Sequence, residues 1–193
     1  MKKRPKVAVV LSGGGALGFA HIGVMDVLIK NKIPMDLIVG TSMGAVIGGS
    51  VSCGCSCKDL EDSVIKLKTR YLFDLCLSFK GVCSGKNALK YIKKVVPDIE
   101  QRDTKIPFIC NAVDLITNEE VVLKEGSILK NIRASMSVPG VFAPVKYGEK
   151  LLVDGGVLNN MPHDIARKEG ADIIIAVDVV SKSNTTGNVK NAV

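Results

Sequence analysis

The chain has 193 residues, a length that fits a single domain with one sizeable core. Hydrophobic residues make up 47% of it and charged residues 23%, which argues against a disordered chain. The net charge of +7 favours anionic partners. Because only 4% of the residues are aromatic and could stack on bases, a membrane surface is favoured over nucleic acid.

Apolar runs alternate with segments of helical spacing. A strand predicted at residues 7–11 leads through a glycine-rich loop into a helix through residues 21–28. A strand at 37–40 precedes a helix at 45–51, and further helices are predicted at 58–70 and 87–96. Strands follow at 108–113, 120–123, 151–153 and 172–180, with a helix through residues 165–166 before the last one. This alternation predicts an α/β fold with a mostly parallel sheet.

The two ends of the chain carry little apolar pattern. Residues 181–193 are polar, so we expect a domain over residues 1–180 and a polar tail that marks a shortened C-terminus. The apolar run after the basic N-terminus is too short for a secretory signal, and no stretch approaches the roughly 18 apolar residues that span a bilayer. We therefore expect a cytoplasmic protein with peripheral access to the membrane and with its six cysteines as free thiols.

The segment Gly40-Thr41-Ser42-Met43-Gly44 lies between a predicted strand and a predicted helix. This is the G-x-S-x-G pattern of a nucleophile elbow, in which small residues two positions from the serine permit a sharp turn. The serine hydroxyl is then held beside the amides that begin a helix, where negative charge is stabilised. A glycine-rich turn with a capping serine is the alternative.

A second glycine cluster, Gly13-Gly14-Gly15-Ala16-Leu17-Gly18, also follows a strand. It matches the spacing of a dinucleotide-binding loop, but that loop requires an acidic residue at the end of the second strand, where this chain has Gly40. We therefore favour an oxyanion hole, because amides of consecutive glycines can approach a substrate oxygen without obstruction.

The serine needs a base. Asp154, followed by Gly155 and Gly156, comes directly after a predicted strand and could accept the proton of Ser42. The only histidines are His21, inside a predicted helix, and His163, at a predicted helix start, so a Ser–Asp pair is favoured over a triad with His163.

A cysteine cluster and an aromatic segment follow the serine motif. Cys53, Cys55 and Cys57 lack the paired spacing of a zinc module, so no metal is predicted. Residues 71–79 hold three of the eight aromatic side chains and are either a lipid-facing flap or a cover of the core.

Four segments, in this order, resemble the patatin-like phospholipase family. They are residues 11–24, 40–44, 134–145 and 153–162. The resemblance implies a three-layer α/β fold with helices on both faces of the sheet. It also implies Ser42 as nucleophile, Asp154 as base and an oxyanion hole at Gly13, Gly14 and Gly15. Many members carry a cation where this chain has Leu17.

The family implies hydrolysis of fatty-acyl esters of lipids with no cofactor. A lipid-binding or regulatory module that keeps the fold without catalysis is the alternative; intact Ser42 and Asp154 count against it.

Overall fold

A seven-stranded mixed sheet forms the centre of the computed structural model, which describes residues 4–66 and 85–180. The strands are β1 (Val7–Leu11), β2 (Leu37–Gly40), β3 (Phe108–Asp114), β4 (Glu119–Leu123), β5 (Val145–Tyr147), β6 (Lys150–Asp154) and β7 (Ile173–Val177). They follow the order β5-β6-β3-β2-β1-β7, with β4 paired to β3 beside this path. The strands from β7 to β3 run parallel, whereas β4, β5 and β6 pair antiparallel.

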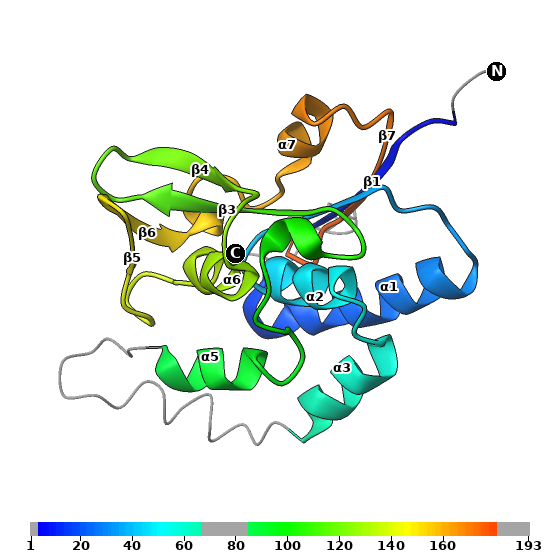
Figure 1. Cartoon of the computed structure of the whole chain (residues 1–193), viewed down its shortest axis with the longest axis horizontal. Helices are drawn as coiled ribbons and strands as arrows, with labels where there is room; N and C mark the ends of the chain where they lie inside the picture. Colours follow the sequence, from blue (N-terminus) through cyan, green and yellow to red (C-terminus); the bar gives the residue numbers. More distant parts are fainter. Residues whose placement is uncertain (1–3, 67–84, 181–193) are drawn as a thin grey trace, which may run out of the picture.

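Helices cover both faces of this sheet (Figure 1). The α-helices are α1 (Ala20–Lys30), α2 (Met43–Ser52), α3 (Cys57–Ile65), α5 (Lys86–Ile92), α6 (Ile128–Ser135) and α7 (His163–Lys168). Short 3-10 turns occur at η1 (Gly15–Phe19), η3 (Gln101–Asp103) and η4 (Gly155–Val157). In Figure 1, α7 lies on one side of the sheet and the other five helices on the opposite side, which gives the three predicted layers.

The continuous apolar sequence of β1 follows from this layering. Successive side chains of a strand point to opposite faces, so a strand covered on both sides has no position for a polar residue. Val9 and Leu11 join the large core beneath α1, α2 and α6, whereas Ala8 and Val10 join a smaller core under α7. All five residues of β1 are buried.

Glycines let α2 pack closely in the large core. A Cβ on Gly48 would lie 2.8 Å from Ile38 on β2, and one on Gly49 would lie 2.6 Å from Ile132 on α6. The small residues that marked this helix in the sequence therefore set how near it approaches the sheet, and with it the position of its N-terminus.

The predicted strands and most predicted helices are confirmed within a few residues. Helix α6 and strand β5 were not predicted. Helix α6 hides its apolar period because its buried face includes three polar residues, Asn131, Arg133 and Ser135. The end of the predicted helix 58–70, the segment 71–79 and the tail 181–193 lie outside the described residues.

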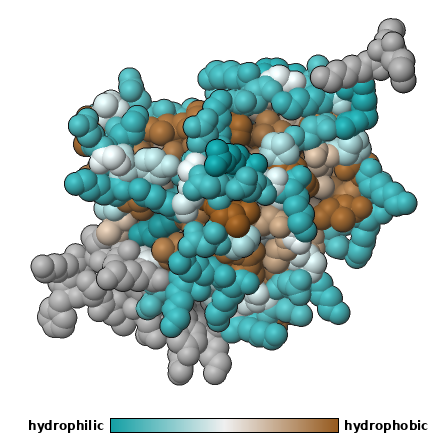
Figure 2. All heavy atoms as spheres, in the orientation of Figure 1, coloured by the Kyte–Doolittle hydropathy of each residue, from teal (hydrophilic) through white to brown (hydrophobic). Residues whose placement is uncertain are grey.

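Within the part of the chain that the structure describes, no helix has the length and apolar character needed to cross a membrane. Hydrophilic side chains cover much of the face drawn in Figure 2, with apolar side chains exposed between them.

Candidate active site

The register of the sheet brings Ser42 and Asp154 together over β3. Gly40, the last residue of β2, pairs with Cys110, whereas Asp154, the last residue of β6, pairs with Ala112 on the same strand. Ser42 lies two residues beyond Gly40, so it comes level with Ala112. Strand β3 continues past the end of β2, and β6 runs antiparallel along this extension. The last residue of β6, Asp154, therefore comes level with Ser42.

The chain turns sharply at Ser42. Its φ of 53° and ψ of −118° lie in a backbone region that residues other than glycine rarely adopt. The turn also requires close backbone contact: a Cβ on Gly40 would collide with the backbone of Gly44, and a Cβ on Gly44 with the carbonyl of Leu11. The spacing of the G-x-S-x-G motif therefore has the steric reason that the sequence suggested.

Ser42 donates a hydrogen bond from Oγ to Oδ2 of Asp154 over 2.6 Å. Both residues are buried, with exposed fractions of 8% and 5%. Burial raises the pKa of Asp154 above its ordinary value of 3.8, although hydrogen bonds from Ser42 and from the Gly156 amide oppose the shift. A buried carboxylate with a raised pKa is a stronger proton acceptor than an exposed one.

The C-terminus of α6 and the loop after it hold the backbone of both Ser42 and Asp154. The backbone N–H of Ser42 donates to Oγ of Ser135 over 3.0 Å, and the N–H of Asp154 donates to the carbonyl of Ser137 over 3.0 Å. Arg133 fastens this loop in turn, since it donates to Oγ of Ser137 and to the carbonyl of Ala143. The sequence predicted no role for these residues, although Ser135 and Ser137 lie in the segment 134–145 that carries part of the family resemblance.

Asn111, in the middle of β3, contacts both the turn that carries Ser42 and the turn after Asp154. It accepts a hydrogen bond from Oγ1 of Thr41 over 2.8 Å, and Gly155 packs against its side chain so closely that no Cβ would fit. A single buried amide thus contacts the residue before Ser42 and the residue after Asp154. The sequence offered no signal for it, because Asn111 stands inside an apolar strand.

The glycine loop between β1 and α1 borders Ser42: a Cβ on Gly13 would lie 3.2 Å from Cβ of Ser42. The Gly13 amide already donates to the carbonyl of Asn160 over 3.2 Å. Gly14 and Gly15, by contrast, have no acceptor for their amides among the described residues. Gly18 lies against Met43, where a Cβ would be 2.5 Å from its Cγ.

Among the described residues, no hydrogen bond joins either histidine to the Ser42–Asp154 pair. His21 is fully buried in α1 and hydrogen-bonds through Nε2 to the carbonyl of Ser12 over 2.9 Å. Burial lowers the pKa of His21. His163 is exposed at the first residue of α7, where Nδ1 lies 2.9 Å from the carbonyl of Met161.

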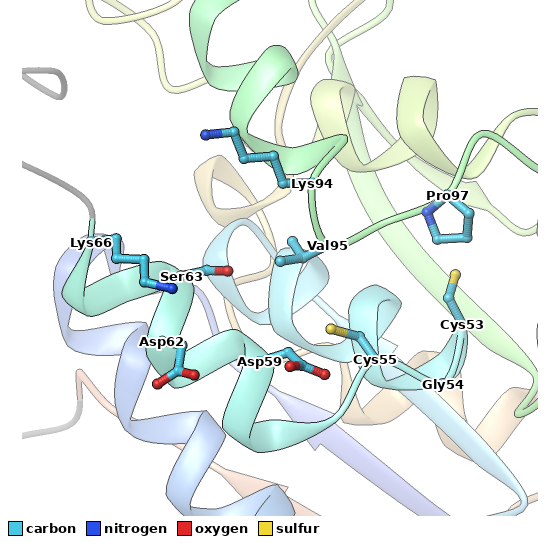
Figure 3. A pocket seen from close by; sticks show the side chains of 10 residues that line it. All are labelled: Cys53, Gly54, Cys55, Asp59, Asp62, Ser63, Lys66, Lys94, Val95 and Pro97. Carbon is cyan, nitrogen blue, oxygen red and sulfur yellow. The ribbon is translucent and has the colours of Figure 1, made fainter.

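A cavity of about 460 Å³ lies at the other end of α2 (Figure 3). Helix α2 is ten residues long, so this cavity is roughly 15 Å from Ser42. Its lining is largely polar: Cys53, Gly54, Cys55, Asp59, Asp62, Ser63, Lys66, Lys94, Val95 and Pro97. Ser42 precedes the opposite end of the helix, so this cavity does not include the Ser42–Asp154 pair.

The cysteine cluster contributes to that cavity as free thiols. In Figure 3 the sulfur atoms of Cys53 and Cys55 point in different directions. Burial raises the pKa of Cys53 to about 11, so it is protonated at neutral pH. Cys57 and Cys110 are free and buried. Among residues 4–66 and 85–180, no three His, Cys, Asp or Glu side chains are grouped as metal ligands.

The chain is thus an α/β protein with the geometry of a nucleophile elbow, in which a serine lies at a strand–helix turn and a carboxylate lies beside it. Within that class, residues 9–167 match the family model described as "Patatin-like phospholipase", and the chain belongs to this family. It is 34% identical to "Lysophospholipase NTE1" of Debaryomyces hansenii over 186 residues. It is 36% identical to "Patatin-like phospholipase domain-containing protein 6" of Homo sapiens over 188 residues.

Each of these alignments covers 93% of this chain but only 12% and 14% of the respective relative. The chain therefore corresponds to a small part of much longer proteins. Among solved structures, VipD from Legionella pneumophila matches 83% of this chain and 47% of its own, with a TM-score of 0.54 and 14% identity. At that identity the likeness shows a shared fold.

Proposed function

We propose that residues 1–180 form a catalytic domain that hydrolyses fatty-acyl esters of lipids through an acyl-Ser42 intermediate. The observation that carries the proposal is the 2.6 Å hydrogen bond from Ser42 Oγ to Asp154 Oδ2. A buried carboxylate in that position accepts the serine proton directly, and no histidine is needed. The names of the relatives, lysophospholipase and patatin-like phospholipase, support a lipid ester as substrate.

In the first step, Ser42 Oγ attacks the ester carbonyl while Asp154 takes its proton. The carbonyl oxygen becomes an oxyanion, and the amides of the glycine loop stabilise it. Gly14 and Gly15 are suited to this role because their N–H groups have no acceptor among the described residues, whereas the Gly13 amide is paired. The C–O bond then breaks, and Asp154 returns the proton to the leaving alcohol or lysolipid.

In the second step, a water molecule takes the place of the leaving group. Asp154 accepts a proton from this water as it attacks the acyl-Ser42 carbonyl. A second oxyanion forms at the same amides and collapses, the ester to Ser42 breaks, and the fatty acid leaves. Asp154 gives its proton back to Ser42 Oγ, which restores the starting state. Neither step uses a cofactor.

Exposed apolar side chains beside the site support a lipid substrate. Leu17 follows the glycine loop and is 62% exposed, and Val157 and Leu158 follow the Asp154 loop with exposed fractions of 52% and 57%. Where many members carry a cation, Leu17 presents apolar surface. Together with the net charge of +7, these residues favour peripheral contact with an anionic membrane. Vesicle binding that weakens as salt rises would support this; binding that ignores salt would argue against charge as the attraction.

The experiment that tests the proposal measures hydrolysis of p-nitrophenyl esters from short to long chains and of lysophosphatidylcholine. Wild type is compared with Ser42→Ala, Asp154→Asn and His163→Ala. We expect the first two variants to lose several orders of magnitude in kcat, because each removes a reacting group. We expect His163→Ala to match wild type, since His163 is exposed and hydrogen-bonds to the Met161 carbonyl and to neither Ser42 nor Asp154.

A non-catalytic lipid-binding module makes different predictions. In that case no ester is hydrolysed, and a fluorophosphonate probe does not label Ser42. If Asp154→Asn retained full activity while His163→Ala lost it, a histidine triad would replace the Ser–Asp assignment.

A further inference from the structure

Asn160 lies between the glycine loop and the loop that carries Asp154. Its side chain donates from Nδ2 to the carbonyl of Gly13 over 3.4 Å, and its own carbonyl accepts from the Gly13 amide over 3.2 Å. Both polar backbone groups of Gly13 therefore contact Asn160. The third contact is steric: a Cβ on Gly156 would lie 2.8 Å from Oδ1 of Asn160.

These contacts fix the direction of an amide that Asn160 does not touch. In a trans peptide, the carbonyl of one residue and the N–H of the next point in opposite directions. When Nδ2 of Asn160 holds the Gly13 carbonyl, the Gly14 N–H points in the opposite direction within the same peptide plane. The Gly14 N–H has no acceptor among the described residues and is thus available to a ligand.

The preceding peptide is held in the same way. The Ser12 carbonyl accepts from Nε2 of His21 over 2.9 Å, while the Gly13 N–H at the other end of that peptide donates to Asn160. Two successive peptide planes of a loop that glycine leaves intrinsically free are thereby restrained. Asn160 also connects the glycine loop to Asp154, because Gly156 packs on Asn160 and donates its N–H to Oδ1 of Asp154 over 2.7 Å.

We propose that Asn160 is a positioning residue that aims the Gly14 amide at the oxyanion and couples the glycine loop to the Asp154 loop. The inference rests on the proposed hydrolase function. It goes beyond that function by assigning a part in transition-state stabilisation to a side chain that hydrogen-bonds to the glycine loop and not to Ser42 or Asp154.

Two substitutions test the side chain. Asn160→Ala removes Nδ2, and Asn160→Asp keeps the shape but places a carboxylate oxygen against the Gly13 carbonyl. Asn159→Ala is the matched control, because the Asn159 side chain donates to Asp164 and not to the glycine loop. Thermal unfolding of each variant shows whether it is folded.

The readouts are kcat, KM and the inhibition constant of a trifluoromethyl ketone, whose serine adduct carries an oxyanion. Loss of a whole oxyanion donor costs about 10²–10³ in kcat, so a misdirected donor should cost about 10-fold to 100-fold. We expect that loss for Asn160→Ala with KM nearly unchanged, a proportional weakening of the ketone, and a larger loss for Asn160→Asp. Asn159→Ala should match wild type.

Two results would overturn the inference. One is an Asn160→Ala variant with wild-type kcat. The other is a kcat loss with unchanged ketone affinity, which would assign Asn160 to general stability. If wild type itself hydrolyses no ester and Ser42 is not labelled by a fluorophosphonate, the proposed function fails, and the inference fails with it.

Discussion

The strained backbone at Ser42 leads to a quantitative prediction about glycine. Replacing a buried serine by glycine normally gives a less stable protein than replacing it by alanine, by about 1 kcal/mol within a helix. At Ser42, however, the φ of 53° and ψ of −118° cost a side-chain-bearing residue about 1–3 kcal/mol, which glycine avoids. Both substitutions lose the hydrogen bond to Asp154, so that loss cancels from the comparison.

Ser50 is the control, because it is buried in the same helix α2, where the backbone is unstrained. At each site the comparison is the free energy of unfolding of the glycine variant minus that of the alanine variant. This difference should be more favourable to glycine at residue 42 than at residue 50 by about 2 kcal/mol, the middle of the strain range. For a chain of this size that corresponds to about 4–8 °C in Tm. Denaturation followed by circular dichroism measures it. If the two sites gave the same difference, the turn would hold no strain.

Three further predictions concern the same site. Activity needs an ionised Asp154, and burial raises its pKa, so the acid limb of kcat/KM should have its midpoint above 3.8; a midpoint at or below 3.8 would contradict the buried base. Because the pKa of Asp154 is raised in the folded state, folding stability falls as pH rises from 3.8 through that pKa. The Asp154→Asn variant carries no such charge, so its Tm should exceed that of wild type at neutral pH but not below pH 3.8. The Gly44→Ala variant should lose several kcal/mol of stability, since a Cβ there would lie 2.6 Å from the Ser12 carbonyl. The control variant Gly23→Ala has open space around the new Cβ and should gain up to about 1 kcal/mol of stability. Equal effects of the two substitutions on denaturation would refute the steric argument.

The apolar period and the glycine motifs made much of the fold predictable. A strand covered on both faces must be continuously apolar, so β1 and β2 were recognisable, and the sharp turn at Ser42 requires the two glycines that mark it in the sequence. Asp154 was found for a local reason as well, as a carboxylate between an apolar strand and two glycines. Helix α6 was missed because hydrogen-bonded polar residues occupy part of its buried face.

The sequence by itself therefore determined the layered α/β class and the candidate residues Ser42 and Asp154, because both follow from patterns within a few residues. Only the tertiary structure decided how these residues meet: β6 runs antiparallel to β3, and β3 continues past β2. The supporting contacts of Ser135, Asn111 and Asn160 likewise join segments between 70 and 147 positions apart. No local pattern encodes such pairs, since they arise from the order of strands in the sheet.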